Sequence, residues 1–117
     1  MDRIAEYVMG MPFLTGLIFF FAAIIMYYYP PKEINSLYGY RTSSSMKSEE
    51  RWGFAQRFSS LRMIEGGLFL ILFSFLKLAF PFSADIEMPI SITALIMVVI
   101  YLLLTTERAL KKNFPNK

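Results

Sequence analysis

Residues 30–60 of the chain read PPKEINSLYGYRTSSSMKSEERWGFAQRFSS, a polar and turn-rich segment in a sequence that is otherwise mostly hydrocarbon. The 117 residues are 56% hydrophobic and 17% aromatic, more apolar than a soluble domain of this size would tolerate. Apolar runs flank the segment on both sides. We therefore interpret it as a connecting segment between membrane helices and the chain as an all-α membrane protein.

The apolar runs predict three transmembrane helices, at about residues 11–29, 61–80 and 90–106. The first run has no charged residue, and at 1.5 Å per residue it covers roughly the 30 Å of a bilayer's hydrocarbon core. Pro30 and Pro31 are expected to end this helix, because proline lacks the donor N–H and disfavours helical backbone before it. We predict a single membrane domain over residues 1–117.

A helix is expected to begin within the polar segment. Ser45 or Ser48 could serve as its N-cap, and Glu49 and Glu50 would then lie in its first turn, where acidic side chains complement the helix dipole. No breaker separates this stretch from the second apolar run. The second span should therefore carry a juxtamembrane helical extension.

The distribution of positive charge predicts the orientation. Ten of the twelve Lys and Arg residues fall in the polar segment and the C-terminal tail, when Arg62 and Arg108 are included; the remaining two are Arg3 and Lys77. The positive-inside rule then places the segment and the tail in the cytoplasm and the N-terminus outside. Asp2 and Glu6 outweigh Arg3, so we expect the first span to be retained and not cleaved as a signal peptide.

Absent residue types exclude several functional classes. The chain has no cysteine and no histidine, which removes the usual zinc and haem ligands and the Ser-His and Cys-His nucleophile pairs. No spacing of its acidic residues matches a catalytic constellation, so we predict no enzyme activity and no cofactor. Because the protein is so apolar, we expect its basic residues to contact the lipid bilayer and its anionic headgroups and not nucleic acid.

The stretch NSLYGYRTSSSMKSEERWGFAQ, residues 35–56, resembles the SdpI-like family of small bacterial membrane proteins. The family pattern is roughly N-x-x-x-G-Y-R-T, then S-x-K-s-x-e-x-W, then A-N. The matching positions are Asn35, Gly39, Tyr40, Arg41, Thr42, Ser45, Lys47, Trp52, Ala55 and Arg57. Gln56 departs from the pattern, where the family usually has Asn, and only one span precedes the motif.

The resemblance implies a location in the bacterial inner membrane and a role in immunity or signalling. Such proteins shield the cell from a membrane-acting peptide toxin and sequester a regulatory protein at the membrane. A peptide toxin or a regulatory protein is accordingly the expected partner, and the chain could also form a homo-oligomer. The alternatives from other functional classes are a small oligomeric transport subunit and a structural subunit of a membrane complex.

Arg41 is the central candidate for binding a ligand or partner. It lies between a tyrosine-glycine turn and a run of hydroxyl residues before a helix N-terminus, a setting that could hold an anion. The full set of candidate residues is Asn35, Tyr38, Gly39, Tyr40, Arg41, Thr42, Trp52 and Gln56. The structural alternative is that Arg41 pairs with Glu49 or Glu50, that the aromatic residues are interface anchors, and that the amides only scaffold the loop.

Glu65 is a second candidate, because a carboxylate just inside a membrane span is costly unless it is paired. Arg62 lies three residues earlier, on the same helix face. The two residues are predicted to form a buried charge pair.

Overall fold

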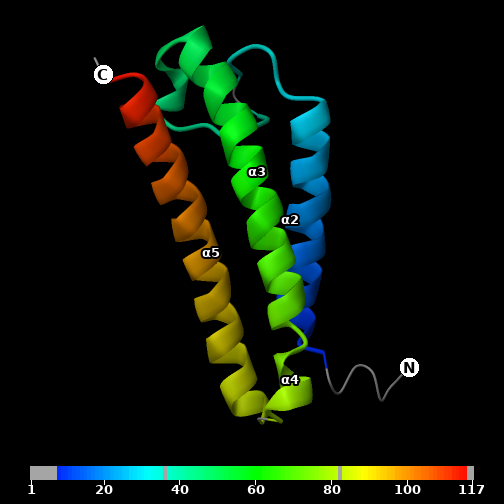
Figure 1. Ribbon diagram of the computed structural model, residues 1–117. Helices are drawn as coiled ribbons and strands as arrows, with labels where there is room; N and C mark the ends of the chain where they lie inside the picture. Colours follow the sequence, from blue (N-terminus) through cyan, green and yellow to red (C-terminus); the bar gives the residue numbers. More distant parts are fainter. Residues whose placement is uncertain (1–7, 36, 82, 116–117) are drawn as a thin grey trace.

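Three long helices, side by side, make up the computed structural model, which describes residues 8–35, 37–81 and 83–115 (Figure 1). The elements are α2 (Gly10–Tyr28), the 3-10 helix η1 (Ser45–Lys47), α3 (Glu49–Phe73), the short α4 (Leu76–Ala79) and α5 (Ala84–Asn113). The described ranges contain no strand, which confirms the prediction of an all-helical fold. The charged N-terminal residues Asp2, Arg3 and Glu6 lie outside the described residues.

The middle helix, α3, lies between α2 and α5 along most of its length (Figure 1). The loop that connects α2 to α3, residues 29–48, lies at the same end of the bundle as the C-terminal end of α5. The short α4 lies at the opposite end. Below, residues 29–48 are called the connecting loop.

Glycines allow α3 to approach both neighbours closely. A Cβ atom at Gly67 would lie 2.8 Å from the backbone nitrogen of Phe20 in α2, and one at Gly16 would lie 2.8 Å from the carbonyl oxygen of Gly67. A Cβ atom at Gly66 would lie 2.6 Å from Cγ1 of Val98 in α5. Small residues commonly permit such contacts in membrane helix pairs. The two consecutive glycines of α3 thus face different helices.

The second apolar run, predicted as one span over residues 61–80, is interrupted after Phe73. The carbonyl of Ser74 accepts a hydrogen bond from the backbone N–H of Met9 (2.8 Å), and the N–H of Leu78 bonds to Phe75 instead. The Ser74 hydroxyl also donates to the carbonyl of Ile71. Because the Ser74 carbonyl is engaged by a distant segment, the α-helical ladder does not continue through it.

The third helix is longer than predicted at both ends. The helix runs from Ala84 to Asn113 and contains the predicted span of residues 90–106, with Pro89 inside it. The acidic residues Asp85 and Glu87 stabilise the earlier start, and Glu87 forms an ion pair with Lys77 of α4 at 2.7 Å.

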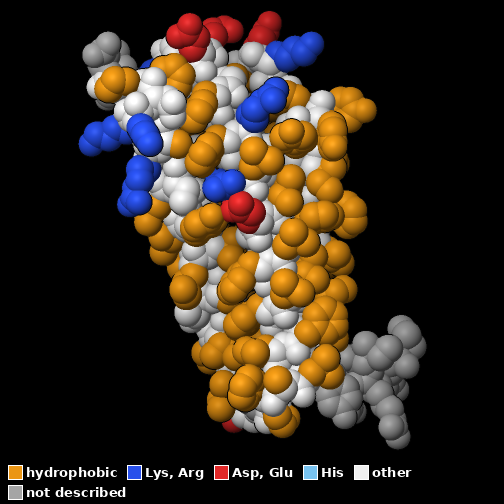
Figure 2. Space-filling view, viewed as in Figure 1, with side chains coloured by type: hydrophobic (Ala, Val, Ile, Leu, Met, Phe, Trp, Pro, Cys, Tyr) orange, Lys and Arg blue, Asp and Glu red, His pale blue; other side chains and the backbone are white. Residues whose placement is uncertain are grey.

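Two helices in the described part of the chain are long and apolar enough to cross a membrane: α2 and residues 85–113 of α5. Because the first half of α3 carries charged side chains, this helix is not apolar enough to be counted with them. Hydrophobic side chains cover most of the visible body of the molecule, and charged side chains gather at the end that bears the connecting loop (Figure 2). This division is typical of helical proteins embedded in a bilayer.

Candidate functional site

The connecting loop is fixed to α3 through the side-chain amide of Gln56. Its Oε1 accepts a hydrogen bond from the backbone N–H of Tyr40 (2.7 Å), and its Nε2 donates to the carbonyl of the same residue (2.8 Å). Gln56 is fully buried. The amide therefore satisfies both polar backbone groups of one loop residue, as a neighbouring strand would do.

Gly39 is required beside this contact. Its φ is +105°, and a Cβ atom there would lie 2.5 Å from Oε1 of Gln56. A larger residue would thus be strained and would also displace the amide.

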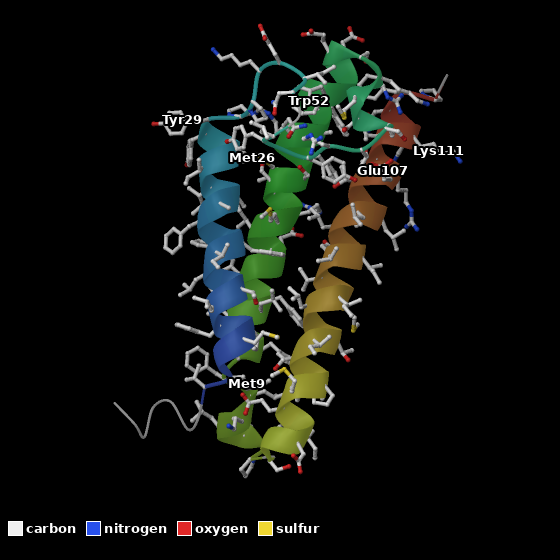
Figure 3. All side chains as sticks on the ribbon, turned by 180° about the vertical axis from the view of Figure 1, so that it is seen from behind. Met9, Met26, Tyr29, Trp52, Glu107 and Lys111 are labelled. Atoms are coloured by element: carbon white, nitrogen blue, oxygen red, sulfur yellow. The ribbon has the colours of Figure 1, made fainter. Side chains whose placement is uncertain are left out.

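Trp52 holds the beginning of the loop, and Figure 3 shows it beneath the loop at the N-terminal end of α3. Its side chain is 1% exposed, and its Nε1 donates a 2.7 Å hydrogen bond to the carbonyl of Pro31. The indole therefore packs as part of the protein's interior and does not lie on a binding surface.

Glu107 connects the loop to α5. Its Oε2 accepts hydrogen bonds from the Tyr40 hydroxyl (2.7 Å) and the Thr42 hydroxyl (2.8 Å). Burial, and then the hydrogen bond to Glu107, raise the pKa of Tyr40 above its usual value. The tyrosine therefore remains a neutral donor to the carboxylate.

Arg51 joins the hydroxyl run to the end of α5. The side chain is 3% exposed; its Nε and Nη2 donate to the carbonyl and hydroxyl oxygens of Ser44, both at 2.7 Å, and its Nη1 donates to the carbonyl of Phe114 at 3.2 Å. A cation beside the C-terminus of α5 is also favourable for the helix dipole. Sequence reasoning identified neither Arg51 nor Glu107 as a site residue, because the contacts that join the loop to α5 connect residues 63 to 67 positions apart.

The remaining loop contacts shape its exposed tip. The side-chain oxygen of Asn35 accepts from the backbone N–H groups of Leu37 (2.9 Å) and Tyr38 (2.7 Å), which is an Asx turn. The backbone carbonyl of Asn35 accepts from Nε of Arg41 at 3.0 Å. At the helix start, Ser48 accepts from the N–H of Arg51, so the expected N-cap is confirmed.

The alternative of an ion pair between Arg41 and Glu49 or Glu50 was wrong. Arg41 is exposed, and within the described part of the chain its two terminal nitrogens make no hydrogen bond. The ion pairs found among these residues are Arg62 with Glu65 and Lys77 with Glu87. The guanidinium of Arg41 is therefore available to an external group.

The predicted site residues thus divide into two groups. Tyr40, Trp52 and Gln56 are buried and hold the loop, while Tyr38 and Arg41 are exposed on it. Thr42 donates its hydroxyl proton to Glu107, so this donor is not directed at an external anion. The structure therefore places the accessible part of the candidate site at the loop tip.

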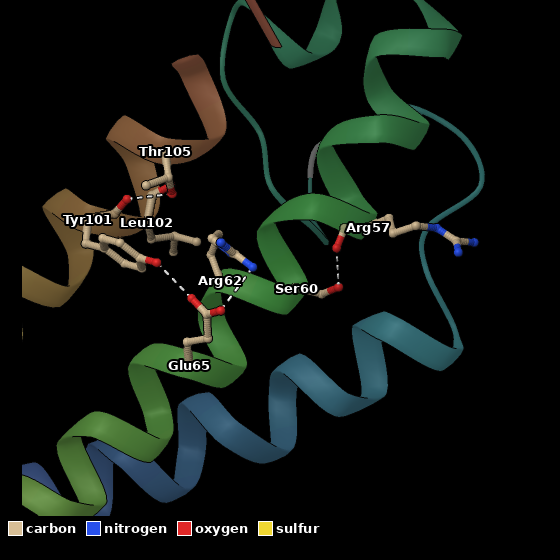
Figure 4. A network of polar contacts seen from close by, with 7 residues as sticks. All are labelled: Arg57, Ser60, Arg62, Glu65, Tyr101, Leu102 and Thr105. Carbon is tan, nitrogen blue, oxygen red and sulfur yellow. Dashed lines mark hydrogen bonds and ion pairs between the residues drawn. The ribbon is translucent and has the colours of Figure 1, made fainter. Parts of the chain in front are cut away.

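The Arg62–Glu65 pair forms as predicted, with Nη2 and Oε2 3.0 Å apart, but it is not buried (Figure 4). The two side chains are 28% and 49% exposed. Tyr101 of α5 adds a hydrogen bond from its hydroxyl to Oε1 of Glu65 at 2.8 Å. The predicted burial was wrong because this side of α3 faces outward beside α5.

Among the residues that the structure describes, no three Asp, Glu, His or Cys side chains lie close enough together to hold a metal ion.

Comparison with known proteins gives a family match and a short curated match. A family model described as the SdpI/YfhL protein family matches residues 32–106. "Uncharacterized protein YfhL" of Bacillus subtilis (strain 168) is 54% identical over 39 residues, which are 33% of this chain and 36% of that protein. The match thus covers about a third of either chain. No solved structure gives a significant match.

Proposed function

Because the chain belongs to the SdpI/YfhL protein family, we propose that it is a non-enzymatic membrane protein that gives immunity to a membrane-acting peptide toxin or signals its presence. It does so by binding a partner at the tip of its connecting loop. The similar protein from Bacillus subtilis is itself named as uncharacterized, so the proposal draws on the family resemblance and on the geometry of the loop.

All three long helices cross the inner membrane in this proposal. Two of them, α2 and α5, have the length and composition of spans, and α3 lies between them. From Leu61 to Phe73, at 1.5 Å per residue, α3 would extend about 20 Å, and α4 follows the interruption at Ser74. The connecting loop and the end of α5 share one end of the bundle, and the positive-inside rule favours the cytoplasm for that end.

The exposed residues of the loop tip are the observation that carries the proposal. Leu37 is 93% exposed, and Tyr38 and Arg41 are exposed beside it, on a loop that buried contacts hold in place. Tyr and Arg are enriched where proteins bind each other. A fixed loop that presents an aliphatic, an aromatic and a cationic side chain fits a partner with an apolar anchor and a carboxylate.

Replacing Arg41 by alanine is expected to lower protection. In bacteria that express the chain at matched membrane levels, the peptide concentration survived should fall about tenfold, because one charge-assisted contact contributes roughly 1.5 kcal/mol or more. Lys32→Ala, which removes an exposed cation from the same loop, is the control and should leave survival unchanged. Equal survival of wild type and Arg41→Ala, or no protection by the wild type, would contradict the proposal.

A further inference from the structure

A groove between α3 and α5 lies outside the loop-tip site. It has a volume of about 320 Å³ and is lined by Glu65, Gly66, Phe69, Met97, Val98 and Tyr101. Its lining is apolar except at one end, where the Glu65 carboxylate and the Tyr101 hydroxyl meet Arg62 (Figure 4). The groove therefore combines a hydrocarbon surface with a polar end that carries both signs of charge.

The polar end of the groove lies close to a membrane boundary in the spanning arrangement proposed above. In the predicted spans, Glu65 lies four residues after the start of the second span at Leu61, and Tyr101 lies five residues before the end of the third span at Thr106. At 1.5 Å per residue these positions are about 6 Å and about 7.5 Å from the membrane boundary on the loop side. Both residues thus lie within reach of the headgroups at that boundary.

Unused hydrogen-bonding capacity remains at this end. Oε1 of Glu65 accepts a hydrogen bond from the Tyr101 hydroxyl and Oε2 forms the ion pair with Arg62, and each oxygen has a further lone pair. Nε of Arg62 is buried and has no partner in the described part of the chain, while the guanidinium lies 5.1 Å from the centre of the Phe58 ring. An external acceptor can reach Arg62 at the exposed part of its side chain, and an external donor can use the remaining lone pairs of Glu65.

We propose that this groove binds one molecule of phosphatidylethanolamine. Its phosphate contacts Arg62, its primary ammonium contacts Glu65, and one acyl chain lies along Phe69 and Met97. The phosphate and the ammonium are joined by a two-carbon linker, and Arg62 and Glu65 are neighbours one helical turn apart.

Charge complementarity favours this lipid over the common alternatives. A phosphatidylglycerol headgroup provides no cation for Glu65 and leaves two anions side by side. A phosphatidylcholine headgroup has a cation without an N–H group, so it cannot donate a hydrogen bond to the carboxylate.

Native mass spectrometry of the detergent-purified protein tests the proposal. The three lipids, with identical acyl chains, are titrated separately, and the fraction of protein with one lipid bound is measured. Phosphatidylethanolamine should bind at least about fivefold more tightly than the other two, as expected for one additional charged hydrogen bond. Equal binding of phosphatidylglycerol or phosphatidylcholine would overturn the proposal.

Two variants locate the binding to the groove. Glu65→Gln keeps an oxygen for Tyr101 but loses the charge, and it should remove the preference for phosphatidylethanolamine; the control Glu50→Gln, an exposed acid at the loop end, should keep it. Met97→Trp should fill the groove and weaken retention of the lipid. Unchanged preference in folded Glu65→Gln would overturn the proposal. The proposal would also be overturned if the wild-type protein formed dimers without bound lipid and Met97→Trp were monomeric. A second copy of the chain, and not a lipid, would then occupy the groove.

Discussion

A Gly67→Leu variant is expected to lose about 3–5 kcal/mol of stability, because it would force α2 and α3 apart. A Cβ atom at this position would lie 2.8 Å from the nitrogen and 3.1 Å from the Cα atom of Phe20, and 2.9 Å from the carbonyl oxygen of Gly16. All of these atoms belong to the backbone of α2, so no side chain can rotate to make room. The whole helix must move.

Thermal unfolding of the detergent-purified protein, followed by helical circular dichroism, measures this effect. Gly53→Leu is the matched control: Gly53 also lies in α3, and a Cβ atom there would meet nothing within 4 Å. The control should unfold near the wild-type temperature, since leucine also favours a helix more than glycine does. Unfolding of Gly67→Leu at the wild-type temperature would show that the helices are not in backbone contact.

The second large effect is expected for Trp52→Ala, which should cost about 3–5 kcal/mol. The substitution removes a nearly fully buried aromatic side chain and leaves the carbonyl of Pro31 without its partner. Because this contact holds the start of the connecting loop, the loop should become accessible to protease. The measurement is the rate of proteolytic cleavage within residues 29–48, together with thermal unfolding.

Trp52→Phe separates the two contributions of the side chain. Phenylalanine keeps most of the packing and loses the N–H donor, so its expected cost is smaller, about 1–3 kcal/mol. If Trp52→Ala is cleaved in the loop no faster than the wild type, the loop does not depend on this anchor.

Much of the helical layout could be predicted from local sequence. The uncharged run before Pro30 and Pro31 gave the first helix to within one residue at each end. Of the two serines proposed as N-cap, Ser48, which precedes two glutamates, is the one before α3. Both signals are local in the sequence, so no tertiary information was needed.

The helix boundaries that the apolar runs did not predict depend on contacts between separate elements. The interruption after Phe73 follows from the bond between Ser74 and Met9, and the early start of α5 accompanies the ion pair of Glu87 with Lys77. Neither partner can be identified from a local pattern. The apolar run alone suggested a continuous second span.

The candidate site was located in the right segment, but its side chains were assigned without their orientation. Tyr40, Trp52 and Gln56 point into the protein because the loop folds back over α3. Glu107 of α5 accepts a hydrogen bond from the Tyr40 hydroxyl. In the sequence, Glu107 is distinguished only as the first charged residue after the uncharged run of residues 90–106. Its two hydroxyl partners could be found only from the fold.

The three-span topology is tested by determining on which side of the membrane the connecting loop lies. The chain has no cysteine, so Ser43→Cys in the loop and Ser83→Cys before α5, both exposed positions, can be labelled singly with a membrane-impermeant maleimide. In right-side-out inner-membrane vesicles we expect labelling of Ser83→Cys alone, and in inverted vesicles labelling of Ser43→Cys alone. Labelling of both positions from the same side would show that α3 does not cross the membrane.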